Sequence, residues 1–167
     1  MKLRFVITAL GILGLLPFLA SVYGVVELQS LFGLSPYKVF STYSAVILTF
    51  LAGSLWANVI ASRDAFNLAP NLVNKGPSLN WPKENVAIAL ALMSNIIALL
   101  CWVLLMLPVQ FYMTLLVVLL FGFIIILCIE TGWSLMLNTV YRDGYLVLRS
   151  ILTVIVCSAH IVMIMLS

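Results

Sequence analysis

Charge is what this sequence has least of. Charged residues make up 8% of its 167 residues and hydrophobic residues 65%, against about 25% and 45–50% in soluble domains. The net charge of +3 is small and no run of basic residues occurs, which argues against a nucleic-acid partner. A chain of this length and composition is expected to form a single membrane domain with no soluble module.

Motifs that carry chemistry are also missing. The chain has no Gly-rich phosphate loop, no Gly-x-Ser-x-Gly elbow and no pair of intramembrane aspartates. We therefore assign no catalytic residue, and we expect a non-enzymatic protein rather than an enzyme. Zinc normally needs three or four ligands, whereas the one histidine and the three cysteines, Cys101, Cys128 and Cys157, are widely spaced. We interpret the cysteines as small buried hydrophobes. No metal and no cofactor can be assigned from the sequence.

What the chain has instead is long apolar runs. The 44 residues 86–129 hold no Asp, Glu, Lys or Arg, and as one helix they would extend about 66 Å, twice the ~30 Å hydrocarbon core of a bilayer. Pro108 interrupts the run near its middle and, lacking an N–H, can end one helix and begin the next. We therefore predict two antiparallel spans joined by a tight turn.

The predicted fold is an all-α integral membrane bundle of five transmembrane helices. The spans are expected at about residues 5–26, 43–62, 86–107, 108–129 and 148–166. The first run resembles a signal peptide, but it exceeds the usual ~7–15 apolar residues and no Ala-x-Ala site follows. Pro17 should kink that span unless a neighbour satisfies the freed carbonyl. Ser35-Pro36 is typical of a helix start.

Small residues recur at every fourth position of the second span: Ala45, Thr49, Gly53, Ala57 and Ala61. Such a stripe lets another helix approach closely in lipid, although chance can also produce it. The third span has a similar narrow face formed by Ala87, Ala91, Asn95 and Ala98.

Basic residues predict the orientation. With five spans, seven of the eight Lys and Arg residues fall on the side of the amino terminus, and only Lys38 falls on the other side. Positive residues accumulate on the cytoplasmic side. We therefore expect a cytoplasmic amino terminus, a periplasmic carboxyl terminus and, for a bacterial protein of this size, a multi-pass location in the inner membrane.

Glu130 and Arg149 are the first candidates for a functional site. Both lie near the cytoplasmic ends of adjacent spans, where an unpaired charge is costly, so we expect them to pair. The pair could bind a proton or a headgroup. The favoured interpretation is a structural salt bridge or snorkelling to the interface.

His160 and Asn95 are polar residues within predicted spans. Ser150, Thr153, Cys157 and His160 share one helical face, which should turn inward. For both His160 and Asn95 we favour a hydrogen bond between helices over a ligand or proton site.

Three apolar motifs carry a resemblance to a known family. They are residues 14–18, 43–56 and 145–153, and the matching positions are Pro17, Tyr43, Gly53, Trp56, Tyr145, Arg149 and Thr153. Their order and spacing resemble the AciT-like family of small multispan membrane proteins, catalogued as a domain of unknown function. The resemblance covers nearly the whole chain and implies a bacterial inner-membrane location with no established reaction. Where that family has histidine before the tryptophan and glycine after it, this chain has Leu55 and Ala57, so a family metal site is not carried over.

The sequence thus favours a non-enzymatic membrane protein that acts through contacts with lipid or with other inner-membrane proteins. Envelope maintenance is one role of this kind. The alternative is a protein that binds a lipid-like or quinone-like molecule, or a metal ion, between its helices. The functional candidates are Glu130, Arg149, Tyr145, His160, Asn95 and Trp56. Partner, ligand and oligomeric state do not follow from the sequence.

Overall fold

The described part of the chain is a helical bundle. A computed structural model describes residues 2–27, 30–31, 33–68, 84–137 and 142–167. Its elements are α1 (Lys2–Leu13), α2 (Leu16–Val26), α3 (Pro36–Leu68), α5 (Glu84–Leu105), the 3-10 turn η1 (Val109–Phe111), α6 (Tyr112–Leu137) and α7 (Arg142–Leu166).

Five of the described segments are long and apolar enough to cross a membrane, which confirms the predicted all-α bundle. They are Thr8–Val26, Pro36–Leu55, Ile88–Leu105, Tyr112–Gly132 and Leu146–Leu166. The second apolar segment begins earlier than expected, because α3 already starts at Pro36. Residues 69–83, between α3 and α5, lie outside the described part of the chain.

Prolines mark the breaks between helices, as their chemistry predicts. The first span is divided into α1 and α2 just before Pro17, and the carbonyl of Gly14 at this break accepts a hydrogen bond of 3.0 Å from the hydroxyl of Tyr43 on α3. The carbonyl of Ser35 accepts the first hydrogen bonds of α3. The turn at Pro108 reverses the chain, and η1 follows it before α6 begins.

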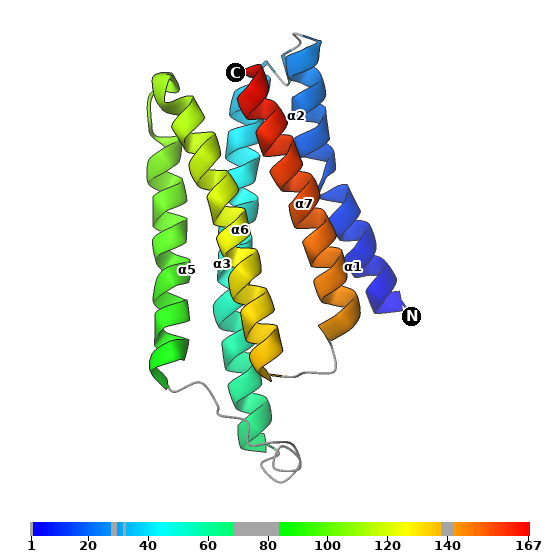
Figure 1. Ribbon diagram of the computed structural model, residues 1–167, viewed down its shortest axis with the longest axis vertical. Coiled ribbons are helices and arrows are strands. Elements are labelled where there is room, and N and C mark those ends of the chain that lie inside the picture. The colour runs from blue at the N-terminus through cyan, green and yellow to red at the C-terminus, as the bar shows by residue number, and fades with distance from the viewer. Residues whose placement is uncertain (1, 28–29, 32, 69–83, 138–141) are drawn as a thin grey trace.

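Helix α3 is the central element of the bundle, in contact with α2, α5 and α6. Helix α7 lies between α6 and the α1–α2 pair, whereas α5 stands at the other edge of the bundle (Figure 1). Two tyrosines join three helix ends: Tyr37 donates to the carbonyl of Leu166, and Tyr112 donates to the carbonyl of Tyr37, both at 2.6 Å. The starts of α3 and α6 and the end of α7 therefore share one end of the bundle.

Of the small-residue stripe predicted for the second span, Ala45 lies on the packing face of α3 and Gly53 does not, while the side chains of Ala57 and Ala61 lie outside the described part of the structure. A Cβ atom added at Gly53 would meet nothing within 4 Å, whereas one added at Gly122 on α6 would lie 2.6 Å from Cδ2 of Leu48. The buried face of α3 instead consists of Phe40, Ser41, Ser44, Ala45, Leu48, Ala52 and Leu55. Helices α3 and α6 thus approach closely at Gly122 of α6 rather than at Gly53 of α3. The side chain of Leu48 on α3 fills the space beside Gly122.

Candidate polar site between α6 and α7

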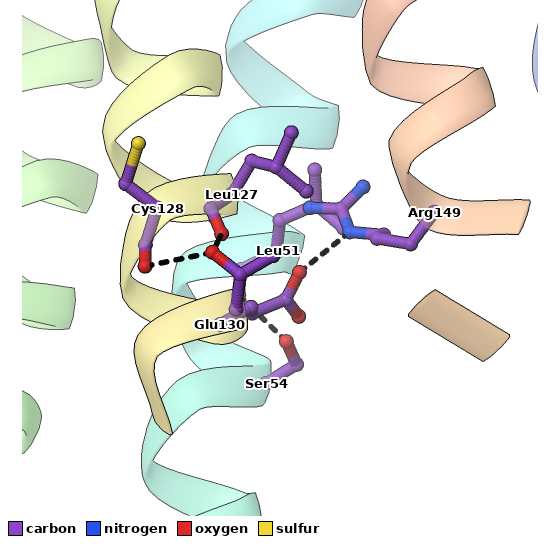
Figure 2. A network of polar contacts seen from close by, with 7 residues as sticks. Leu51, Ser54, Leu127, Cys128, Glu130 and Arg149 are labelled. Carbon is purple, nitrogen blue, oxygen red and sulfur yellow. Dashed lines mark hydrogen bonds and ion pairs between the residues drawn. The ribbon is translucent and has the colours of Figure 1, made fainter. Parts of the chain in front are cut away.

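The centre of the candidate site is an ion pair between α6 and α7. Nε of Arg149 donates to Oε2 of Glu130 at 2.7 Å, and Figure 2 shows the guanidinium reaching from α7 toward the carboxylate on α6. Only 8% of Arg149 and 6% of Glu130 remain exposed. The pairing expected from the sequence is therefore present, within the last turn of the apolar segment of α6 and the first turn of that of α7.

The pair leaves two polar atoms without partners. Oε1 of Glu130 and Nη2 of Arg149 are both buried and form no hydrogen bond with any described residue. Neighbouring hydroxyls do not supply the missing bonds, because Ser54 donates to the carbonyl of Leu51 at 2.7 Å and Thr131 donates to carbonyls of its own helix (Figure 2). A buried polar atom without a partner costs about 1–3 kcal/mol, and more when it is charged. The site therefore offers a buried acceptor and a buried donor.

Further buried polar residues lie along the inner face of α7, beyond Arg149. Thr153, one turn beyond Arg149, and His160 are buried, and Oγ1 of Thr153 has no partner. At ~1.5 Å per residue the row from Arg149 to His160 extends about 16 Å. Ser150 and Cys157, which were predicted to share this face, are only half-buried, because the buried row follows Arg149, Thr153, Val156 and His160 instead.

His160 occupies a different environment from the ion pair. Its ring centroid lies 4.7 Å from that of Phe40, 5.5 Å from that of Phe123 and 6.2 Å from that of Phe18. Nδ1 lies 2.9 Å from the carbonyl of Val156 on the same helix, which assigns the proton to Nδ1 and leaves Nε2 as an acceptor without a partner. The predicted hydrogen bond between helices is therefore wrong for His160, because aromatic rings from three other helices enclose it.

The remaining candidates do not join the ion pair within the described structure. Asn95 is exposed and donates from Nδ2 to the carbonyl of Ala91 one turn earlier, at 2.9 Å, so its predicted bond to another helix is also wrong. Trp56 lies in α3 and Tyr145 in α7, and both side chains fall outside the described part of the structure. Among the described residues, no three His, Cys, Asp or Glu side chains are placed to hold a metal ion.

Chemically, the arrangement suits hydrogen bonding better than covalent catalysis. The charges of Glu130 and Arg149 cancel, and the pair presents one free acceptor beside one free donor. A third polar atom, Oγ1 of Thr153, lies on the same helical face. The sequence identified Glu130 and Arg149 through the cost of an unpaired charge near hydrocarbon, and Thr153 through its spacing on α7. It gave no indication of the three phenylalanines around His160, because they come from separate helices.

Comparison with known proteins identifies the family but no reaction. The family model described as "Protein of unknown function (DUF3429)" matches residues 3–165 of the chain. No curated protein and no solved structure matches it. Since the match covers nearly the whole chain, this protein belongs to the DUF3429 family of proteins of unknown function.

Proposed function

We propose that this protein is a non-enzymatic, multi-pass membrane protein that binds the polar head of a lipid-like molecule at the Glu130–Arg149 pair. The observation that carries the proposal is the buried, unpartnered state of Oε1 of Glu130 and Nη2 of Arg149. Ionisable groups within apolar spans are rare and generally mark functional sites. A ligand group that bonds to both atoms accounts for one donor and one acceptor that the described residues leave unused.

The chemistry of the pair favours a neutral hydroxyl group over an anion. A hydroxyl donates one hydrogen bond and accepts others, so a single oxygen can satisfy Glu130 and Arg149 together. A phosphate at this position would find a donor in Arg149 but would face the carboxylate of Glu130, and the positive charge of Arg149 is already used by that carboxylate. The expected ligand is therefore a lipid that carries a free hydroxyl and no phosphate.

The position of the pair fits a headgroup site. Glu130 lies two residues before Gly132, where the apolar segment of α6 ends, and Arg149 lies three residues after the start of that of α7. The pair is therefore about one helical turn below the membrane surface. A hydroxyl bound at this depth leaves an acyl or isoprenoid chain within the hydrocarbon. The quinone-like alternative fits in its reduced form, because a quinol has hydroxyls whereas a quinone only accepts hydrogen bonds.

The experiment measures the melting temperature of the detergent-purified protein with added lipids. Diacylglycerol is the hydroxyl-bearing probe, phosphatidic acid is its phosphorylated counterpart, and triacylglycerol lacks both groups. We expect diacylglycerol to raise the melting temperature of the wild type most, and to have no effect on the double variant Glu130→Leu with Arg149→Leu, which removes both the acceptor and the donor. The matched control is Ile125→Ala, an exposed site on α6, which should keep the wild-type response.

Two results would contradict this function. Stronger stabilisation by phosphatidic acid would show an anion site, and equal stabilisation of the wild type and the double variant would show that lipids act elsewhere on the surface. An equal response to all three probes would show that the ion pair is only a structural salt bridge.

The location and orientation belong to the same proposal. The motif residues that resemble the AciT-like proteins support a bacterial inner membrane and a role in envelope maintenance, and the distribution of Lys and Arg supports a cytoplasmic amino terminus. A topology reporter fused after Ser167 should report the periplasm, and one inserted at Lys75 the cytoplasm. The opposite result at either position would overturn the orientation.

A further inference from the structure

Helix α5 has two faces of the same spacing, and only one of them packs against another element in the described part of the chain. The inner face, formed by Leu90, Ser94, Ile97 and Cys101, is buried or half-buried and packs on α3. The outer face is broad, and the line of exposed residues that runs through Asn95 consists of Ile88, Leu92, Asn95, Leu99 and Trp102. Figure 1 shows α5 at the edge of the bundle, away from α7 and α1.

The outer residues follow the spacing of a coiled-coil seam. Ile88, Leu92, Asn95, Leu99 and Trp102 are separated by four, three, four and three residues, which is the heptad pattern of helices that pack along one another. Exposed apolar residues alone do not require a partner, because lipid chains are as apolar as the side chains. Asn95 at the middle of this seam is the exception.

Asn95 is a polar residue placed where lipid would surround it. Its position is close to the centre of the apolar segment Ile88–Leu105. Its one hydrogen bond within the described structure uses a single N–H, toward the carbonyl of Ala91. The amide oxygen and the second N–H remain available, and the hydrocarbon offers neither a donor nor an acceptor.

We infer that the outer face of α5 binds the same face of a second copy of this chain, forming a parallel homodimer. Two copies inserted with the same orientation are related by a twofold axis along the membrane normal. This axis places Asn95 opposite Asn95 at the same depth, where each amide donates to the other. One polar residue in an otherwise apolar seam also fixes the register of the two helices. A different partner protein would have to supply its own polar group at exactly this depth.

This inference does not depend on the proposed lipid site. The seam lies on α5, which packs on α3, whereas Glu130 and Arg149 lie between α6 and α7. A variant of the seam should therefore leave the response to diacylglycerol unchanged, and a variant of the ion pair should leave the dimer intact.

Photo-crosslinking in native membranes tests the inference. The photoreactive residue p-benzoylphenylalanine replaces Leu99, at the seam, or Leu100, which is also exposed but lies about 100° around the helix. We expect Leu99→p-benzoylphenylalanine to give a product of twice the chain mass that contains only this protein, and the Leu100 variant to give little. Equal products from both positions, or a product that contains a different protein, would overturn the homodimer.

Variants of Asn95 then test its role in the same assay. Asn95→Leu keeps the exposed surface apolar and should raise the dissociation constant of the dimer by about threefold to thirtyfold, the range expected for one hydrogen bond between membrane helices, and so lower the crosslinked fraction. Asn95→Gln retains the amide and should recover most of it. An unchanged fraction in Asn95→Leu would contradict the pairing of the two amides.

Discussion

The two polar groups on the inner face of α7 differ in what surrounds them. His160 is enclosed by Phe18, Phe40 and Phe123, and its Nδ1 bonds to its own helix. Arg149 is paired with Glu130, and each keeps a buried polar atom without a partner. Burial alone therefore does not identify a site: the same helix carries one polar group packed by rings and another whose hydrogen bonding is incomplete.

The largest expected effect breaks the ion pair. Arg149→Ala leaves the carboxylate of Glu130 buried without a counter-charge, which should lower the free energy of unfolding by about 3–5 kcal/mol. The double variant Glu130→Gln with Arg149→Gln should recover part of this loss, because no charge then remains. Unfolding in detergent of the wild type, both single Gln variants and the double variant gives the coupling. Additive effects would mean that the two residues do not interact.

A smaller effect is expected from crowding the contact between α3 and α6. Gly122→Val places a side chain where Leu48 already lies, and overpacking of this kind costs about 1–3 kcal/mol. Gly53→Ala is the control, since a Cβ there meets no atom within 4 Å. Melting temperatures of the two variants should differ clearly. Equal values would show that the glycine of α6 is not where the helices come closest.

Removing one hydrogen bond at the break between α1 and α2 should cost less still. Tyr43→Phe deletes the hydroxyl that donates to the carbonyl of Gly14, and a bond of this kind contributes about 0.5–1.5 kcal/mol. The measurement is again unfolding in detergent, with Tyr23→Phe as a matched control because Tyr23 is exposed. A loss equal to that of the control would show that the carbonyl at the break does not need Tyr43.

The smallest effect tests the aromatic surroundings of His160 directly. His160→Leu replaces the ring by an apolar side chain of similar volume among Phe18, Phe40 and Phe123, so the free energy of unfolding should change by less than about 1.5 kcal/mol. The stabilisation by diacylglycerol should persist. Loss of that stabilisation with an intact fold would place His160 in the ligand site and remove the contrast with Arg149.

Local chemistry explains which parts of the fold could be predicted. Pro17, Pro36 and Pro108 each lack an N–H, so the break within the first span, the start of α3 and the hairpin after α5 follow from single residues. The pairing of Glu130 with Arg149 follows from the cost of isolated charge in hydrocarbon. These predictions need no knowledge of how the helices are rotated.

The sequence does not determine how each helix is rotated about its own axis. Gly53 and Asn95 were expected to face other helices, yet Gly53 has open space beside it and Asn95 points outward. Most residues of this chain are apolar whether they are buried or exposed, so the hydrophobic period that orients soluble helices is weak. The contact of Gly122 with Leu48 and the rings around His160 depend on this rotation, and for that reason only the structure reveals them.

The most direct test of the central claim is native mass spectrometry of the protein released from mild detergent. The wild type should retain one lipid whose mass and fragmentation identify a free hydroxyl and no phosphate. The folded double variant, Glu130→Leu with Arg149→Leu, has neither the acceptor nor the donor and should lose it, while Ile125→Ala keeps it. A wild-type protein that carries only phospholipid, or a double variant that retains the same hydroxyl lipid, would contradict the assignment of the Glu130–Arg149 pair as its binding site.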